Sequence, residues 1–153
     1  SLEFTTNQLT LSAWVKWNEF PGASSYTDQT VLGRYDAGSG SRYFLYFFRG
    51  GGSLQIDFLV RPSAVLGPYY LYTDYSFNTS QWYFLTAVYN DTNISLFING
   101  TLINSDVVGG GSFTDGSTDL SIGWGAKGII DDARVYSRAL STTEIMNLYT
   151  LGR

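Results

Sequence analysis

The stretch Gln81-Trp82-Tyr83-Phe84-Leu85-Thr86-Ala87-Val88-Tyr89 is strongly apolar and rich in aromatic and β-branched residues. Such residues favour the pleated backbone of a β-strand. A strand that presents apolar side chains on both faces is covered on both sides. The sequence therefore predicts a central strand at residues 82–89.

A hairpin is predicted directly after this strand. Residues 93–98 and 101–105 are strand-like, and the pair Asn99-Gly100 separates them. Asn-Gly is the favoured pair for a type I′ turn, because both residues tolerate a positive φ. The period-two alternation of apolar residues expected of a half-buried antiparallel strand recurs at residues 9–17 and 54–61.

The rest of the chain contains further short strands and one helix. Strands are expected at residues 30–35, 42–48, 119–123 and 128–136, with turns at glycine-rich segments. The aromatic stretch 66–77 is expected to be an elaborated loop. Ser141 and Glu144 form a capping box before one short helix that Gly152 ends. About ten strands without alternating helices predict an all-β sandwich of antiparallel sheets.

Composition bounds the function. The 153 residues suit one domain spanning 1–153, either a mature product or an excerpt of a longer chain. With 14% charged residues, a net charge of −4 and no basic stripe, nucleic acid and anionic membranes are not expected partners. No apolar run approaches the roughly 18 residues of a membrane span, so membrane insertion is not expected.

Four N-x-S/T sequons, at Asn78, Asn90, Asn93 and Asn99, indicate a secreted or surface glycoprotein. The alternative is that strand edges and turns simply favour Asn, Ser and Thr. Cysteine is absent, so no disulfide adds to the argument. We expect an extracellular location, or one on a cell or virion surface.

Several segments resemble known strands of laminin G-like domains of the concanavalin A-like lectin/glucanase superfamily. The segments, in the order of the family, are Leu9–Lys16, Gln81–Tyr89, Ile94–Leu102 and Ile130–Ser141. The last one, IDDARVYSRALS, is the most specific. The resemblance spans nearly the whole chain and implies a jelly-roll sandwich of two antiparallel sheets with a short C-terminal helix. It also implies a role in recognition or adhesion, with a glycan or an extracellular protein as partner.

Two departures from the family pattern matter. Only Ser1 to Thr6 precede the first matching strand, so the usual opening strand is lost, divergent or outside this sequence. The second is the aromatic stretch 66–77. The resemblance implies a calcium ion near the opening and last strands, with Asp131 and Asp132 as its ligands here. The alternative is that one of these carboxylates pairs with Arg134 or caps a turn while the other faces water.

Catalysis is not expected, although the superfamily includes glucanases. A retaining glycosidase needs two carboxylates about 5–5.5 Å apart. The three Glu residues form no such pattern, and the adjacent Asp131 and Asp132 would point to opposite faces of a regular strand. Histidine is absent, which removes the commonest general base and, with cysteine, the usual zinc ligands.

Exposed aromatic side chains with neighbouring hydrogen-bonding groups are the candidates for glycan binding. They are Tyr69, Tyr70, Tyr72, Asp74, Tyr75 and Trp124. The alternative is that these aromatics cover the core or contact a neighbouring domain. The other aromatic residues of 43–48 and 82–84 are most simply assigned to the core. Trp14, opposite the apolar face of its strand, packs either on the second sheet or beneath the helix.

The leading hypothesis is a non-catalytic module that binds carbohydrate or a protein partner outside the cell. A structural or assembly domain of a surface protein, appendage or virion is the alternative. Such a domain would associate with copies of itself or with neighbouring domains, because an unfilled sheet edge invites a partner strand. A glycoside hydrolase is the third hypothesis, and the missing acid pair opposes it.

Overall fold

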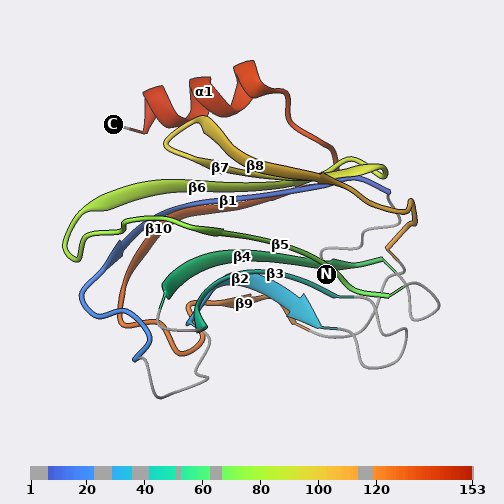
Figure 1. Cartoon of the computed structure of the whole chain (residues 1–153). Helices are drawn as coiled ribbons and strands as arrows, with labels where there is room; N and C mark the ends of the chain where they lie inside the picture. Colours follow the sequence, from blue (N-terminus) through green and yellow to red (C-terminus); the bar gives the residue numbers. More distant parts are fainter. Residues whose placement is uncertain are drawn as a thin grey trace.

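The computed structural model describes residues 7–22, 29–35, 42–50, 53–62, 67–113 and 119–152. These residues form two five-stranded antiparallel sheets, packed face to face with one helix on the outside (Figure 1). The strand order of sheet A is β10 (Gly128–Tyr136), β1 (Leu9–Trp17), β6 (Trp82–Tyr89), β7 (Asn93–Ile98), β8 (Thr101–Val107). The order of sheet B is β5 (Tyr69–Asp74), β4 (Ser53–Arg61), β3 (Arg42–Gly50), β2 (Gln29–Tyr35), β9 (Ser121–Ile122). The predicted antiparallel jelly-roll sandwich is confirmed. Two expectations concern residues outside the described ranges. They are the opening segment, residues 1–6, and residues 51–52 of the glycine-rich turn after residue 50.

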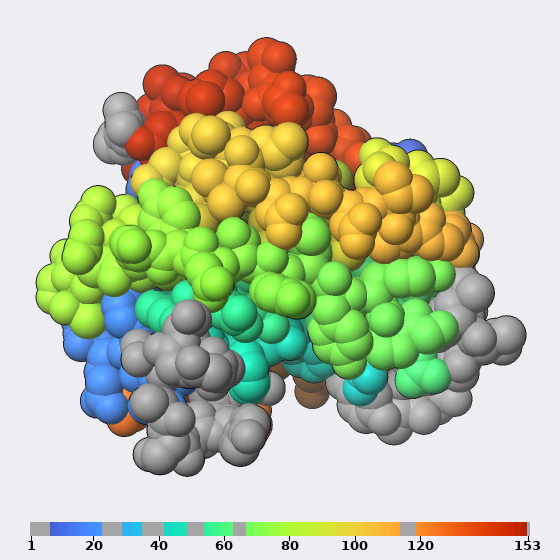
Figure 2. Space-filling view, viewed as in Figure 1, coloured from blue at the N-terminus to red at the C-terminus, as the bar shows by residue number. Residues whose placement is uncertain are grey.

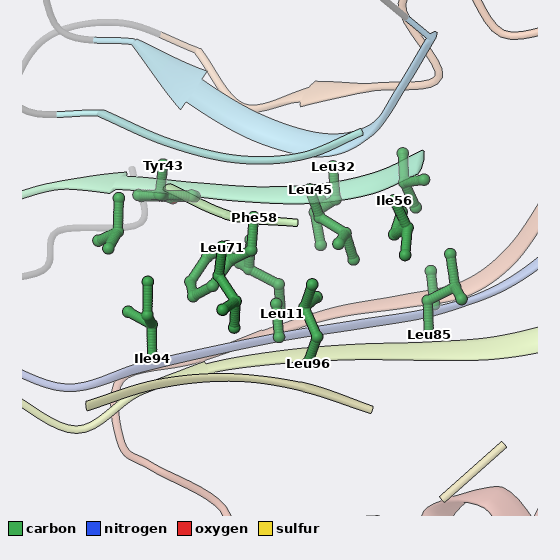
Figure 3. Packing of buried hydrophobic residues seen from close by; sticks show 14 of the residues in the cluster. Leu11, Leu32, Tyr43, Leu45, Ile56, Phe58, Leu71, Leu85, Ile94 and Leu96 are labelled. Atoms are coloured by element: carbon green, nitrogen blue, oxygen red, sulfur yellow. The ribbon is translucent and has the colours of Figure 1, made fainter. Parts of the chain in front are cut away.

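The core lies between the two sheets and is built from alternate residues of each strand. In β1, Leu9, Leu11 and Ala13 are fully buried. Their side chains meet inward-facing side chains of sheet B, as Figure 3 shows for Leu11 opposite Leu45 and Phe58. The period-two patterns therefore gave the correct inner face of both β1 and β4, because one face of each strand is removed from water.

The hairpin β7–β8 has the predicted turn. Asn99 and Gly100 have φ of 52° and 77°, as a type I′ turn requires. The Asn99 side chain fixes the turn to the neighbouring strand, because its Oδ1 accepts a hydrogen bond from the Phe84 amide at 2.9 Å. Strand β6 lies between β1 and β7, so the central position predicted for residues 82–89 is confirmed.

The prediction of a loop at residues 66–77 was wrong for residues 69–74. Residues Tyr69–Asp74 form β5, the edge strand of sheet B, paired with β4. Leu71 alone of this strand is fully inside the sandwich, at 4% exposure, while Tyr70 and Tyr72 point outward. A single clearly buried position gives too little alternation for a strand to be distinguished from an aromatic loop. Figure 2 shows β5 beside β8, where the Asn104 side chain donates a hydrogen bond to the Tyr72 carbonyl at 2.9 Å.

Helix α1 (Thr142–Leu151) lies across the outer face of sheet A, on the opposite side of the sandwich from sheet B (Figure 1). The predicted capping box of Ser141 and Glu144 is present. The helix buries Ile145 against a second hydrophobic cluster that includes Phe84 and Phe97. Trp14 lies beneath this helix, which decides between the two places predicted for it. In the described part of the chain, no helix has the length and apolarity to cross a bilayer.

Candidate ligand-binding surfaces

The outer face of sheet B carries aromatic side chains in two cross-strand rows. In one row, Phe44 of β3 pairs with Leu59 of β4, which pairs with Tyr70 of β5. In the other row, the partners are Tyr46, Asp57 and Tyr72. Side chains of paired residues lie on the same face. The register therefore places four aromatic rings on one side of this sheet, with Asp57 between Tyr46 and Tyr72.

Gly33 of β2 allows the Phe44 ring of β3 to lie directly against the backbone of β2. A Cβ atom at this position would lie 2.1 Å from Phe44 Cδ1. Such a separation is far below van der Waals contact, so any larger residue would displace the ring. Because glycine has no side chain, the Phe44 ring can extend over the outer face of the sheet at this position.

A groove of about 620 Å³ lies over this part of sheet B. Its described lining consists of Thr30, Arg42, Phe44, Tyr46, Leu59, Ser121 and Trp124. The volume is within the roughly 300–1,000 Å³ of small-molecule sites. Aromatic rings together with hydroxyl groups and a guanidinium give the groove both flat apolar surface and hydrogen-bonding groups.

Trp124 forms one wall of the groove and projects into solvent, with 69% of its surface exposed. Gly123 and Gly125 on either side have φ of 72° and 70°, which glycine adopts without steric cost. The Trp124 carbonyl accepts a hydrogen bond from the Thr30 amide at 2.9 Å, so the turn is fixed to β2. The sequence predicted that Trp124 projects from the rim, and the structure confirms its exposure.

The predicted ligand-binding residues do not form one cluster. Tyr70, Tyr72 and Asp74 are exposed on β5, at one edge of sheet B, whereas Trp124 lies near the opposite edge, beside β2 and β9. Both groups border the same outer face. Tyr69 and Tyr75 are instead half-buried against the core and are poorly placed to contact a ligand. Whether any of these residues binds a ligand remains a prediction.

The assignment of the aromatic residues of 43–48 and 82–84 to the core was wrong for four residues. Phe44, Tyr46 and Phe48 alternate with the buried Tyr43, Leu45 and Phe47, so they face outward from β3. The sequence contains a signal for this orientation. Arg42 is charged and alternates in step with these three residues, which indicates that their face of the strand points to solvent. Trp82 is the fourth, with 37% of its surface exposed on the outer side of sheet A.

Asp131 and Asp132 line a second cavity, on the outer face of sheet A beside the end of α1. The prediction that they face opposite sides was wrong, because β10 has a bulge here. The register between β1 and β10 shifts between Ser12 and Trp14, and Asp132 has a φ of 49°. A bulge changes the alternation of side chains locally. It brings both carboxylates to one cavity.

The two carboxylates fit calcium poorly. Asp132 Oδ1 accepts a hydrogen bond from Arg134 Nε at 2.7 Å, and Asp131 Oδ1 accepts one from the Asp132 amide at 2.8 Å. Calcium takes about six to eight oxygen ligands. Among the described residues, no group of three or more His, Cys, Asp or Glu side chains is placed to hold a metal ion. Calcium binding at Asp131 and Asp132 therefore remains a prediction without a supporting donor set.

The comparisons with known proteins agree with this fold. A family model described as Concanavalin A-like lectin/glucanases superfamily matches residues 1–146. A search of curated proteins found no match.

Three solved structures illustrate the likeness. The binding domain of botulinum neurotoxin DC, in complex with SialylT, is 17% identical with a TM-score of 0.68 over 96% of this chain. A botulinum neurotoxin type C structure, whose cell entry is described as dependent on interaction with two ganglioside molecules, is 16% identical with a TM-score of 0.65 over 96% of this chain. The chain spans 36% of each of these toxin chains.

The third structure is a native heptameric SAP-like pentraxin from Limulus polyphemus. It is 14% identical with a TM-score of 0.65, over 96% of this chain and 71% of the pentraxin chain. Sequence identities this low show that the sandwich fold is shared, and they carry no information about the ligand. The family match covers nearly the whole chain, and the chain therefore belongs to the concanavalin A-like lectin/glucanases superfamily.

Proposed function

We propose that the protein is a non-catalytic carbohydrate-recognition module that acts outside the cell, and that it binds a glycan along the outer face of sheet B. The aromatic groove carries this proposal. A sugar presents a flat face of C–H groups and a ring of hydroxyls. Tyr46, Phe44 and Trp124 offer flat apolar surface, while Arg42 and Ser121 offer hydrogen-bonding groups beside it.

The length of the aromatic face favours an extended glycan over a single sugar. Tyr70 and Tyr72 continue the rows of Phe44 and Tyr46 to the far edge of the sheet, and they are 50% and 57% exposed. Solvated rings of this size are a cost to a protein unless a partner covers them. Successive sugar units could occupy the groove and then the β5 edge.

The residue types that line the groove argue against a hydrolase. None of the described residues that line it is Asp or Glu. Glycosidases use a pair of carboxylates on either side of the scissile bond. Asp57 is nearby in the register but only 8% exposed, and Asp74 lies at the sheet edge. Binding without cleavage is therefore the function that this surface supports best.

Two structural neighbours are linked to glycan ligands: one is in complex with SialylT, and cell entry of the other depends on gangliosides. These ligands belong to much larger chains, so they support a glycan-binding role for the fold without locating a site here. The neighbours and the sequons together support an extracellular or surface location.

The test is a glycan-array screen of the wild-type protein and of Trp124→Ala and Tyr46→Ala, each with calcium and with a chelator. We expect a specific glycan signal that each variant weakens about tenfold, which corresponds to roughly 1.4 kcal/mol. Leu102→Ala, on the exposed edge strand β8, is the matched control and should bind as the wild type does.

Product analysis of the bound glycan should show no cleavage. Absence of glycan binding by a folded wild-type protein would contradict the proposal. Cleavage of a bound glycan would replace it with a hydrolase. Binding that the chelator abolishes would direct attention to Asp131 and Asp132 as calcium ligands.

A further inference from the structure

The second cavity has no role in the proposed function. It lies on the outer face of sheet A, opposite the groove, and has a volume of about 900 Å³. Its lining comes from β1, β6, β10, the β7–β8 turn and the end of α1. Segments far apart in the sequence thus meet at one concave surface, as is typical of ligand sites.

Three aromatic side chains line this cavity. Trp14 stacks on Tyr149 of α1, with 5.7 Å between ring centroids and 28° between ring planes. Trp82 is the third ring, and its exposed fraction is 37%. The Lys16 ammonium lies 5.2 Å from the Trp82 ring centroid, which is within cation–π range.

The Trp14 indole provides a buried hydrogen-bond donor. Its Nε1 atom is inaccessible to solvent, and none of the described residues accepts its hydrogen. Gly152, which also lines the cavity, lies directly against Nε1, since a Cβ there would be 2.3 Å away. A buried donor without a partner costs roughly 1–3 kcal/mol, and a ligand oxygen would satisfy this donor once Gly152 moves away from the indole.

Amide groups add donors to the same cavity. Asn99 uses its Oδ1 to accept the Phe84 amide, which leaves its NH₂ group for other partners. Gln81 also lines the cavity, with its Oε1 turned toward Asn78 at 3.4 Å. The ligand therefore meets N–H donors from an indole and from two amides.

The acceptors are the carboxylates of Asp131 and Asp132, which the bulge in β10 places together. Their charge is balanced locally. Arg134 pairs with Asp132 at 2.7 Å, and the Lys16 ammonium lies over Trp82. Two acids and two bases give a formal sum of zero. Such a site does not select a ligand by net charge, but it can both accept from and donate to hydroxyl groups.

We propose that this cavity is a second binding site and that it takes a neutral saccharide. With Gly152 displaced from the indole, a sugar hydroxyl can accept from Trp14 Nε1 and donate to Asp131, and Trp82 offers a flat ring for the face of the sugar. Because the local charges balance, neither an acidic nor a cationic ligand gains net Coulomb energy in this cavity. The proposal follows from this cavity alone and stands or falls separately from the groove on sheet B.

The four tryptophans make the two sites separately visible by NMR. Trp14 and Trp82 line the cavity, Trp124 lines the groove, and Trp17 is buried in the core with its indole N–H donated to Gln29. The experiment follows their indole N–H resonances while methyl glycosides of neutral hexoses, N-acetylhexosamines and lactose are added. N-acetylneuraminic acid and tetramethylammonium serve as charged comparators. Trp14→Phe and Trp82→Phe assign the resonances.

We expect at least one neutral sugar to shift the Trp14 and Trp82 resonances saturably at concentrations up to about 10 mM, ten times a Kd of roughly 1 mM. The Trp17 resonance should not move. Trp14→Phe keeps a ring against Tyr149 but removes the donor, and should weaken binding about three- to tenfold.

Asp131→Asn should weaken binding similarly. Its matched control is Asp106→Asn on β8, where Oδ1 likewise accepts the amide of the next residue, from Val107 at 2.8 Å. This control should bind as the wild type does.

Three outcomes would overturn the proposal. They are a Trp14 resonance that no neutral sugar moves, a shift caused by tetramethylammonium or N-acetylneuraminic acid but not by neutral sugars, and equal binding by Asp131→Asn and Asp106→Asn. A shift of Trp124 alone would support the groove and reject the cavity. A shift of Trp14 and Trp82 without Trp124 would support the cavity and count against the groove.

Discussion

Trp14 and Tyr149 are stacked with 5.7 Å between their ring centroids, and this contact joins the outer face of sheet A to helix α1. The same two rings contact Phe84 at 5.3 and 6.4 Å. We therefore expect Tyr149→Ala to release the end of α1. The predicted loss of stability is about 1–3 kcal/mol, because Tyr149 is half-buried and its ring contacts are lost.

Chemical denaturation measures that loss. Asn147→Ala, an exposed position of the same helix, is the control and should change the free energy of unfolding by less than about 0.5 kcal/mol. Equal effects of the two substitutions would show that the ring contacts do not hold the helix in place.

The bulge at Asp132 predicts a ranking of substitutions. Asp132 has a φ of 49°, a conformation that glycine adopts freely and that valine adopts only at a cost. Both Asp132→Gly and Asp132→Val remove the ion pair with Arg134, so their difference isolates the backbone. We expect the valine variant to be less stable than the glycine variant by about 1–2 kcal/mol in thermal or chemical denaturation. A valine variant as stable as the glycine variant would show that β10 can lose the bulge freely.

The capping box predicts a pH dependence at the acid end. Hydrogen bonds from Arg138, and from Ser141, lower the pKa of Glu144 from its ordinary value of 4.5 to about 2. A carboxyl group whose pKa is lower in the folded state stabilises the fold above its unfolded pKa. That contribution is therefore full above about pH 4.5 and is lost as the pH falls to about 2.

The measurement is the free energy of unfolding as a function of pH, for the wild type and for Glu144→Gln. Glutamine can still complete a capping box but does not titrate. The variant should be less stable near neutral pH, and its stability should fall less between pH 4.5 and pH 2. Parallel curves for the two proteins would contradict the assigned role of Glu144.

The four sequons differ in what their side chains do in the fold. Asn78 and Asn90 are exposed, and the Asn90 hydrogen bonds run through Oδ1, which leaves the glycan-bearing Nδ2 at the surface. Asn93 and Asn99 are instead half-buried, and Asn93 Nδ2 donates to Thr92 Oγ1 at 2.9 Å. We expect the folded, secreted protein to carry glycans at Asn78 and Asn90 only.

Peptide mapping by mass spectrometry, after expression in a glycosylating host, measures the occupancy of each sequon. Asn78→Gln and Asn90→Gln should each remove one glycan without loss of folding. Asn99→Gln should instead destabilise the protein, because glutamine does not favour the positive φ of this turn. A folded product with full occupancy at Asn99 would contradict the structural role of that side chain.

The sequence was sufficient for the fold where a local pattern determines the structure. The alternation in β1, the Asn99-Gly100 turn and the Ser141–Glu144 capping box each depend on near neighbours, and each was predicted. It was insufficient where the structure depends on register. The bulge that turns Asp131 and Asp132 to one side follows from pairing with β1, which no local pattern reports.

The candidate sites show the same division. The outward direction of Phe44 and Tyr46 could have been predicted from their alternation with Tyr43 and Leu45. The meeting of Trp14 with Tyr149 joins residues at opposite ends of the chain and needed the folded molecule. Residue type alone does not distinguish a buried aromatic side chain from an exposed one, because aromatic residues occur both in the core and on the surface.

The position of α1 has a consequence for a sample that holds many copies of the protein. The helix and its cavity lie on the outer face of one sheet, the aromatic groove lies on the outer face of the other, and the sheets are about 10 Å apart. With both faces occupied, one molecule would tie two polysaccharide strands together, and many would turn a dilute polymer solution into a network. Loss of either face would leave a binder that coats strands without cross-linking them, a difference that turbidity or viscosity would register even where affinity hardly changed.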